Sequence, residues 1–153
     1  LYALLDAPSV AGAYRFVIRP GETTVTDVQA SLFPRTALSR VGLAAQTSMF
    51  LFGPQDRNGV DDFRDAAHDS DGLAVLTASG ERIWRPLANP PLQTRISAFG
   101  GEGVGGFGLQ QRARSIADFD DLEARYDRRP SLWAEPLSDW GPGEVRLIEL
   151  PAR

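Results

Sequence analysis

An aspartate-rich stretch over residues 52–72 holds the side chains best placed to do chemistry. It contains His68, the only histidine of the chain, and six aspartates, which are Asp56, Asp61, Asp62, Asp65, Asp69 and Asp71. Long loops on a rigid scaffold commonly carry catalytic and binding residues. A carboxylate in such a loop can act as a general base, because this role needs only a carboxylate directed at a water molecule and a shell that excludes bulk solvent.

Asp69 is one aspartate of this stretch that has suitable neighbours for such a base. His68 and Asp71 lie next to it in the sequence and can influence its protonation through charge and hydrogen bonding. The alternative is that Asp69 only closes an Asx-turn. Nucleophilic catalysis has less support, because no serine stands in a glycine elbow, and one histidine cannot make a multi-histidine metal site.

The run Asp69-Ser-Asp-Gly72 also resembles part of a calcium-binding loop. An EF-hand would need an acid at Ala67 and a closing glutamate at Ala78, and neither is present. Calcium bound in another arrangement of these acids remains an alternative. The simpler alternative is that the aspartates cap turns and pair with Arg57 and Arg64.

A second motif, Gly101-Glu-Gly-Val-Gly-Gly106, matches the glycine pattern of dinucleotide-binding folds as a string. That pattern binds pyrophosphate only where a helix follows it. Here the next residues, 107–111, have the composition of a strand. We therefore favour a flexible hairpin loop.

Aromatic residues interleaved with arginines suggest a site for sugars. The rings are Trp84, Trp133, Trp140, Tyr2, Tyr14 and Tyr126, and the polar neighbours are Arg85, Arg125, Arg128, Arg129 and Asn89. Rings stack on the apolar faces of sugars, while Arg, Asp and Asn pair with hydroxyls. The alternative is that each ring belongs to the core. Trp84 and Trp133 fit that alternative well, and Tyr126 fits it least.

Composition restricts the class of protein. The 153 residues suffice for one domain with a substantial core, and a net charge of −4 without any lysine disfavours nucleic acid as a partner. No apolar run is long enough to span a membrane. The absence of cysteine excludes disulfides, thiolate catalysis and Cys-based zinc sites. The chain opens and closes on apolar runs without an initiator Met, so we expect a fragment.

The elements around the aspartate-rich stretch are predicted to be strands. Alternation and β-branched or aromatic content predict strands at residues 1–5, 13–19, 22–33, 48–52, 73–77, 81–85, 93–99, 107–112, 132–135 and 144–150. We expect residues 22–33 to be half-buried and 48–52 to be buried on both sides, whereas residues 38–45 are ambiguous. One short helix is predicted over residues 118–126. Nine or ten strands favour an all-β fold, a sandwich or a barrel.

Several separate motifs resemble one known family. They are SMFLFGP (48–54), VDDFR (60–64), HDSDGL (68–73), IWRPL (83–87), GFGL (106–109), DLEARYD (121–127), RPSLW (129–133) and LIELP (147–151). Together they resemble the osmoregulated periplasmic glucan biosynthesis proteins of the G/D type. The resemblance covers essentially the whole chain.

The resemblance implies a fold and an activity. It implies a large antiparallel, galactose-mutarotase-like β-sandwich, of which residues 1–153 are the C-terminal half, without the N-terminal half and the C-terminal immunoglobulin-like domain. It also implies a periplasmic enzyme that hydrolyses linear β-1,2-glucan internally, with inversion. Asp69 corresponds to the general base and Tyr126 lies in the substrate cleft. The general acid is an aspartate a few residues beyond Pro151.

We expect further substrate contacts from His68, Asp71, Trp84 and Arg85. No cofactor or metal is expected, and the expected partners are a β-glucan chain, the remainder of the protein and, as an open option, a second copy. Ala88 replaces an asparagine of the family pattern, which leaves linkage preference and product length open. The alternatives are a non-catalytic glucan-binding or assembly factor and a calcium-dependent lectin.

Overall fold

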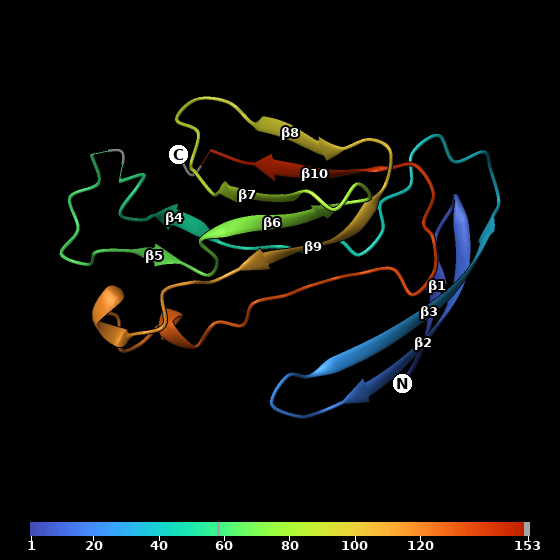
Figure 1. Ribbon diagram of the computed structural model, residues 1–153, viewed down its shortest axis with the longest axis horizontal. Coiled ribbons are helices and arrows are strands. Elements are labelled where there is room, and N and C mark those ends of the chain that lie inside the picture. Colours follow the sequence, from blue (N-terminus) through green and yellow to red (C-terminus); the bar gives the residue numbers. More distant parts are fainter. Residues whose placement is uncertain (58, 152–153) are drawn as a thin grey trace. The chain divides into compact units, whose positions relative to one another are not determined.

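The computed structural model describes residues 1–57 and 59–151, and it divides into two compact units, residues 1–43 and 44–153. In the described residues the secondary structure is ten antiparallel strands and two 3-10 turns, with no α-helix (Figure 1). The all-β class is thus confirmed. Within that same part of the chain, no helix is long and apolar enough to cross a membrane.

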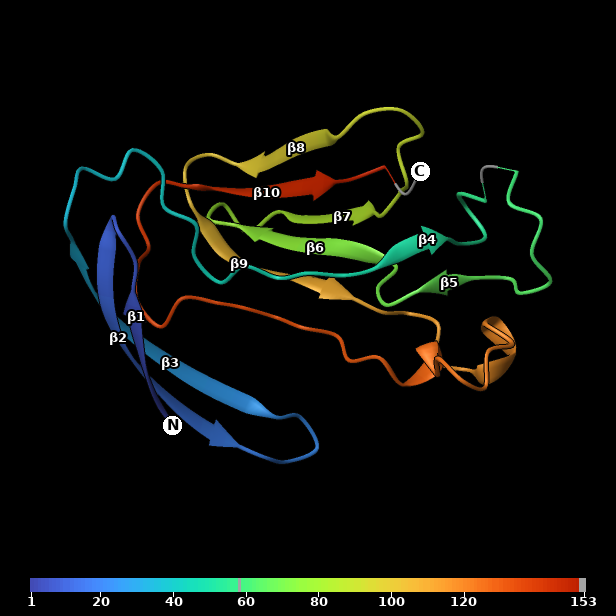
Figure 2. The same cartoon turned by 180° about the vertical axis from the view of Figure 1, so that it is seen from behind.

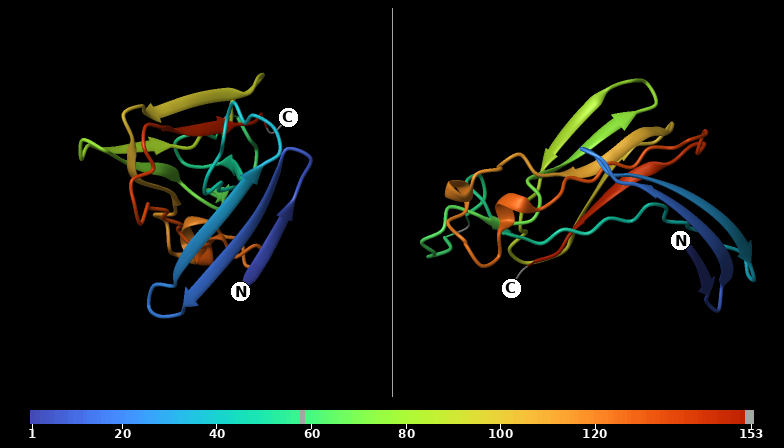
Figure 3. Two further views of the ribbon diagram at one scale, coloured as in Figure 1. Left: turned by 90° about the vertical axis from the view of Figure 1, so that its right-hand side faces the viewer. Right: turned by 90° about the horizontal axis from the view of Figure 1, so that it is seen from below.

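The first unit is a three-stranded antiparallel meander. Its strands are β1 (Tyr2–Asp6), β2 (Val10–Arg19) and β3 (Val25–Pro34), in the spatial order β1-β2-β3, and they curve together as one ribbon (Figure 3). The strand predicted at residues 22–33 is present, but it is not half-buried, since Val28 is 50% and Phe33 61% exposed. The alternating pattern therefore predicted the strand correctly and its burial wrongly.

The second unit contains three small sheets. One has the order β7-β6-β9, built from β6 (Gly72–Thr77), β7 (Arg82–Pro86) and β9 (Val104–Gln110). The others pair β8 (Arg95–Gly100) with β10 (Glu144–Glu149) and β4 (Phe50–Phe52) with β5 (Ala67–His68). The hairpin predicted from residues 73–85 is confirmed as β6 and β7. Of the glycine-rich motif, residues 101–103 connect β8 to β9 and residues 104–106 already belong to β9, so a strand follows rather than a helix. The prediction of a hairpin loop is wrong, because β8 and β9 lie in different sheets.

Two apolar clusters hold the second unit together. The first joins strands of two sheets and comprises Leu73, Val75, Leu87, Leu109, Val145 and Leu147. The second lies between β4, β5 and the 3-10 turns η1 (Ile116–Asp118) and η2 (Tyr126–Arg128), and comprises Phe52, Ala66, Ala67, Phe119 and Tyr126. Figures 1 and 2 both show η1 and η2 at the end of the unit where β5 lies. This second cluster supports the candidate site.

The helix predicted over residues 118–126 is wrong. Asp120 and Arg125 both adopt a φ of 51°, in the left-handed region that an α-helix cannot contain. The acids that signalled a helix start cap turns instead, because Asp121 Oδ1 accepts the N–H groups of Glu123 (3.2 Å) and Ala124 (2.8 Å).

Two of the predicted strands differ from the structure. Residues 132–135 form only an isolated bridge between Phe107 and Ala134, although Ala134 exchanges both backbone hydrogen bonds with Phe107. In β4, Phe52 is fully buried but Leu51 is 38% exposed, so this strand is not buried on both sides as predicted. The second difference arises because the burial of a strand is set by neighbours distant in sequence.

Candidate active site

Asp69 directly follows β5 and pairs with Met49, which directly precedes β4. Its backbone N–H donates to the carbonyl of Met49 (2.8 Å), and the Met49 N–H donates to Asp69 Oδ2 at 3.3 Å. The side chain remains 31% exposed. The strand pairing therefore fixes the direction of this carboxylate while part of it still faces solvent.

Arg129 connects Asp69 to Tyr126. Its Nε lies 3.1 Å from Asp69 Oδ1, and its guanidinium carbon lies 5.7 Å from the centroid of the Tyr126 ring. Tyr126 is only 9% exposed, and its carbonyl accepts a hydrogen bond from the Gln111 amide. Asp69 and Tyr126, far apart in sequence, are thus brought to one place by a third residue that was not selected from the sequence.

His68 lies beneath Asp69 and not at the surface. Its ring is 1% exposed, stacks on Phe50 at 5.3 Å and meets the edge of Phe119 at 5.2 Å. Nε2 lies 3.5 Å from Asp71 Oδ1, and Nδ1 has no hydrogen-bond partner among the described residues. Burial lowers the pKa of His68, against the opposing charges of Asp71 and Asp69. Burial therefore favours the uncharged imidazole, whose Nε2 faces the carboxylate of Asp71.

Asp71 anchors the next segment of the chain. Its Oδ2 accepts the backbone N–H groups of Arg112 (2.5 Å) and Ala113 (3.3 Å). The Arg112 guanidinium lies 5.5 Å from the Trp84 ring, which is 37% exposed and covers Gly72 so closely that a Cβ there would lie 2.4 Å from the ring. Asp71 and Trp84 thus belong to one group of contacts around Arg112.

Arg85 belongs to a different group. Neighbouring residues on a strand point to opposite faces, so Arg85 leaves β7 on the face opposite to Trp84. There it pairs with Glu149 at 3.3 Å, and Glu149 also accepts from Arg95 Nε and the Ala88 N–H, each at 2.8 Å. The carboxylate of Glu149 is 4% exposed and raises the pKa of Arg95. Glu149, on β10, therefore contacts β7 through Arg85 and β8 through Arg95.

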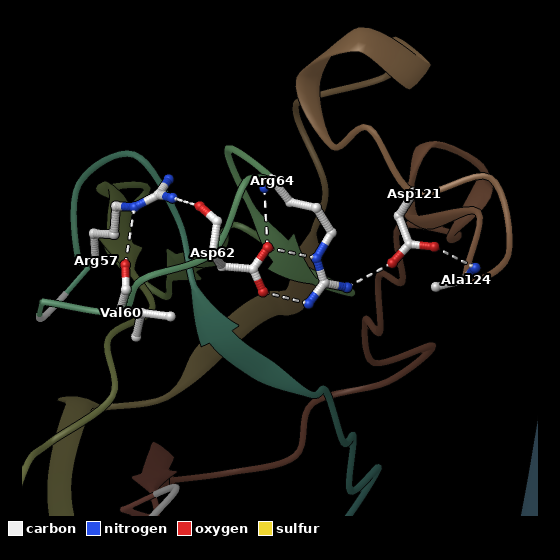
Figure 4. A network of polar contacts seen from close by, with 6 residues as sticks. All are labelled: Arg57, Val60, Asp62, Arg64, Asp121 and Ala124. Atoms are coloured by element: carbon white, nitrogen blue, oxygen red, sulfur yellow. Dashed lines mark hydrogen bonds and ion pairs between the residues drawn. The ribbon is translucent and has the colours of Figure 1, made fainter.

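Asp62, from the earlier part of the stretch, belongs to a further network with arginines and Asp121 (Figure 4). Arg64 holds both oxygens of Asp62, at 3.0 and 2.8 Å, and reaches Asp121 Oδ2 at 2.6 Å. Hydrogen bonds from Arg64 lower the pKa of Asp62 to about 2, and Arg57 donates to the Asp62 carbonyl. Of the predicted pairing of the aspartates of this stretch with Arg57 and Arg64, the pair of Asp62 with Arg64 is thus present, whereas Arg57 donates to the carbonyls of Val60 and Asp62.

An open groove of about 510 Å³ runs between the two segments that this network joins. Its lining residues are Asp61, Asp62, Phe63, Arg64, Asp120, Asp121, Leu122 and Glu123. The described residues do not bring three His, Asp or Glu side chains together in a way that could hold a metal ion.

The structure therefore gathers five of the six selected residues, in two adjoining groups, and separates the sixth. His68, Asp69, Asp71, Trp84 and Tyr126 are joined through direct contacts or through Arg129 and Arg112, whereas the contacts of Arg85 are with Glu149. Arg129 was named from the sequence only among the arginines near the aromatic residues, and it was not selected as a site residue, because no local pattern reports its contact with Asp69.

Comparisons of the sequence with known proteins agree on one family. The family model described as "Periplasmic glucan biosynthesis protein, MdoG" matches residues 1–153. "Glucans biosynthesis protein G" of Rhodopseudomonas palustris is 60% identical over 100% of this chain and 30% of its own length, and the Vibrio cholerae protein of that name is 58% identical over 100% and 28%. That of Shewanella sp. is 58% identical over 99% and 28%. The chain thus spans less than a third of the curated relatives that it matches.

Proposed function

The chain belongs to the periplasmic glucan biosynthesis protein family, and from this membership we propose that it forms part of an enzyme that hydrolyses linear β-1,2-glucan internally, with inversion. The family description gives the periplasm as the location. We call a polypeptide of the relatives' full length that contains this chain the family-length protein. In it, we propose that residues 1–153 form the C-terminal half of a galactose-mutarotase-like β-sandwich that carries the active site.

The observation that carries this proposal is the state of Asp69. Its carboxylate is held by Arg129 and by the Met49 N–H, yet it is 31% exposed. Each carboxylate oxygen can accept more than one hydrogen bond. Both oxygens therefore keep capacity for a water molecule, which a general base requires in addition to a fixed orientation.

The reaction assigns distinct roles to two carboxyl groups. Asp69, as the base, takes a proton from water while the water oxygen attacks the anomeric carbon on the face opposite to the leaving oxygen. A carboxylic acid on the other side protonates that leaving oxygen, and we propose for it an aspartate that follows residue 153 in the family-length protein. The β linkage then yields an α product.

The neighbouring residues have supporting roles in this proposal. Trp84, which is 37% exposed, offers its ring to the sugar. Tyr126 is buried and contacts Arg129 through its ring, while Arg129 fixes Asp69 and leaves its exposed part available for hydroxyls. His68 and Asp71 support Asp69 indirectly, because they hold the turn that presents it. We propose no direct substrate contact for Arg85 on the face where it pairs with Glu149.

The test is incubation of the family-length protein with linear β-1,2-glucan. We expect shorter chains to accumulate from internal cleavage, and NMR of the first product should give the α anomer. Retention of the β anomer would overturn the inverting mechanism. Binding of the glucan without any cleavage would overturn the enzymatic proposal altogether.

A second candidate is a non-catalytic glucan-binding or assembly factor. The ion pair between Asp69 and Arg129 favours it, because a carboxylate and a guanidinium placed side by side offer an acceptor and donors to sugar hydroxyls. In that case Asp69 and Arg129 would only contact hydroxyls. The candidate predicts that Asp69→Asn weakens glucan binding, whereas loss of a base leaves binding intact and removes cleavage.

A further inference from the structure

The pair between Asp69 and Arg129 depends on a segment that has little regular structure of its own. Residues 121–129, which we call the site segment, contain only one 3-10 turn and include Arg125 with a φ of 51°. Asp121 at its start and Tyr126 near its end both contact other parts of the chain. Something must therefore fix this segment in register with β5.

Arg64 provides a fixed point at the start of the site segment. Its Nη1 lies 2.6 Å from Asp121 Oδ2, while its Nε and Nη2 hold Asp62. The side chains are shielded, with exposures of 23% for Arg64 and 12% for Asp121. The planar guanidinium thus joins two segments distant in sequence and satisfies both with charge-assisted hydrogen bonds (Figure 4).

The other oxygen of Asp121 continues the connection into the site segment. Oδ1 accepts the N–H of Ala124 at 2.8 Å, and the Asp121 carbonyl accepts the N–H of Arg125 at 3.2 Å. The next residue is Tyr126, which packs in the second apolar cluster with Phe119. The carboxylate of Asp121 therefore connects Arg64 to the turn that precedes Tyr126.

We propose that Arg64 is a positioning residue, which holds the site segment where Arg129 meets Asp69. This inference rests on the proposed function, because positioning matters only if Asp69 acts on a substrate. Arg64 is not a catalytic residue in this account, since its contacts are with Asp62 and Asp121. It acts through the segment that Asp121 caps.

Hydrogen exchange tests the positioning without reference to activity. In the family-length protein, Arg64→Gln should speed exchange of the amides of Ala124, Arg128 and Arg129 about tenfold, because the loss of a charge-assisted pair releases the segment. Those amides donate to Asp121, Arg125 and Tyr126 in the structure. Unchanged exchange in these three amides would overturn the proposal.

The rate of hydrolysis of linear β-1,2-glucan provides a second test of the positioning role. Arg64→Gln should lower kcat about tenfold, but in an Arg129→Gln background the same substitution should lower it less than about twofold, because the segment then has no contact with Asp69 to align. An equal loss in both backgrounds would show that Arg64 affects only stability, and would overturn the proposal.

Two further variants keep the test decisive. Asp121→Asn retains an oxygen for Ala124 and replaces the one facing Arg64 by an amide, so it should reproduce the effects of Arg64→Gln even if the latter folds poorly. The control is Arg146→Gln, since Arg146 pairs with an acid two residues before it, Glu144, as Arg64 does with Asp62. It should change neither exchange nor kcat.

The two proposals can fail separately. A wild-type protein that does not cleave the glucan would remove the proposed function, while the exchange experiment would still decide whether Arg64 positions the segment. A wild type that cleaves, with exchange and rate unaffected by Arg64→Gln, would leave the function intact and overturn the positioning role.

Discussion

Replacement of Phe119 by alanine should reveal how strongly the second apolar cluster supports the site. The Phe119 side chain is fully buried, with its ring 5.2 Å from the His68 ring and 5.8 Å from the Tyr126 ring, centroid to centroid. Truncation removes the apolar group between them and leaves a cavity. The surrounding residues come from β4, β5 and the 3-10 turns, and they can collapse into that cavity only in part.

The expected cost follows from the burial. Loss of a fully buried phenylalanine lowers the free energy of unfolding by about 3–5 kcal/mol. Phe63 offers a matched control, because the same substitution there removes a ring that is 83% exposed, and surface changes usually stay within about 0.5 kcal/mol. The difference of about 3 kcal/mol corresponds to a shift of more than about a hundredfold in the unfolding equilibrium.

Equilibrium urea unfolding of the family-length protein provides the assay. We expect Phe119→Ala to lower the transition midpoint clearly, with little change for Phe63→Ala, and glucan hydrolysis by the folded variant to fall because Tyr126 loses its support. A difference in unfolding free energy below about 1 kcal/mol between the two variants would refute this reasoning.

Two other perturbations address the packing and the titration of the same unit. Burial lowers the pKa of His68 from 6.5. As the pH falls below 6.5, the unfolded chain takes up a proton at this residue more readily than the folded chain, so the free energy of unfolding should fall by up to about 1.4 kcal/mol per pH unit. His68→Gln should remove this pH dependence, measured by urea unfolding at several pH values. A Cβ on Gly108 would lie 1.9 Å from the Leu132 carbonyl oxygen, whereas one on Gly143 would meet nothing within 4 Å. Thermal or urea unfolding should therefore show a loss near the upper end of about 1–3 kcal/mol for Gly108→Ala and little for Gly143→Ala, and equal losses would contradict this packing.

The strands could be predicted from the sequence because their pattern is local. Alternation and turn residues located the β6–β7 hairpin and β10 within a residue or so at most ends. The segment around Asp121 could not be predicted in this way, because an aspartate at a helix start and an aspartate that caps an isolated turn look alike. The left-handed conformations of Asp120 and Arg125 decide between them.

The candidate site was predictable to the extent that it is contiguous. His68, Asp69 and Asp71 lie within four residues, so their proximity follows from the sequence. The contact between Asp69 and Arg129 joins β5 to a turn far along the chain, and no periodicity reports it. The same holds for Arg85, whose partner Glu149 lies on a strand of another sheet.

The direct test of the central claim is the rate at which the family-length protein with Asp69→Asn cleaves linear β-1,2-glucan. An amide of the same shape cannot take a proton from water, so we predict a loss of about 10²- to 10⁴-fold in kcat with binding of the glucan retained. Asp65→Asn, a change of the same kind in the same stretch, is the control and should leave the rate unchanged. Undiminished hydrolysis by Asp69→Asn would contradict the assignment of Asp69 as the general base.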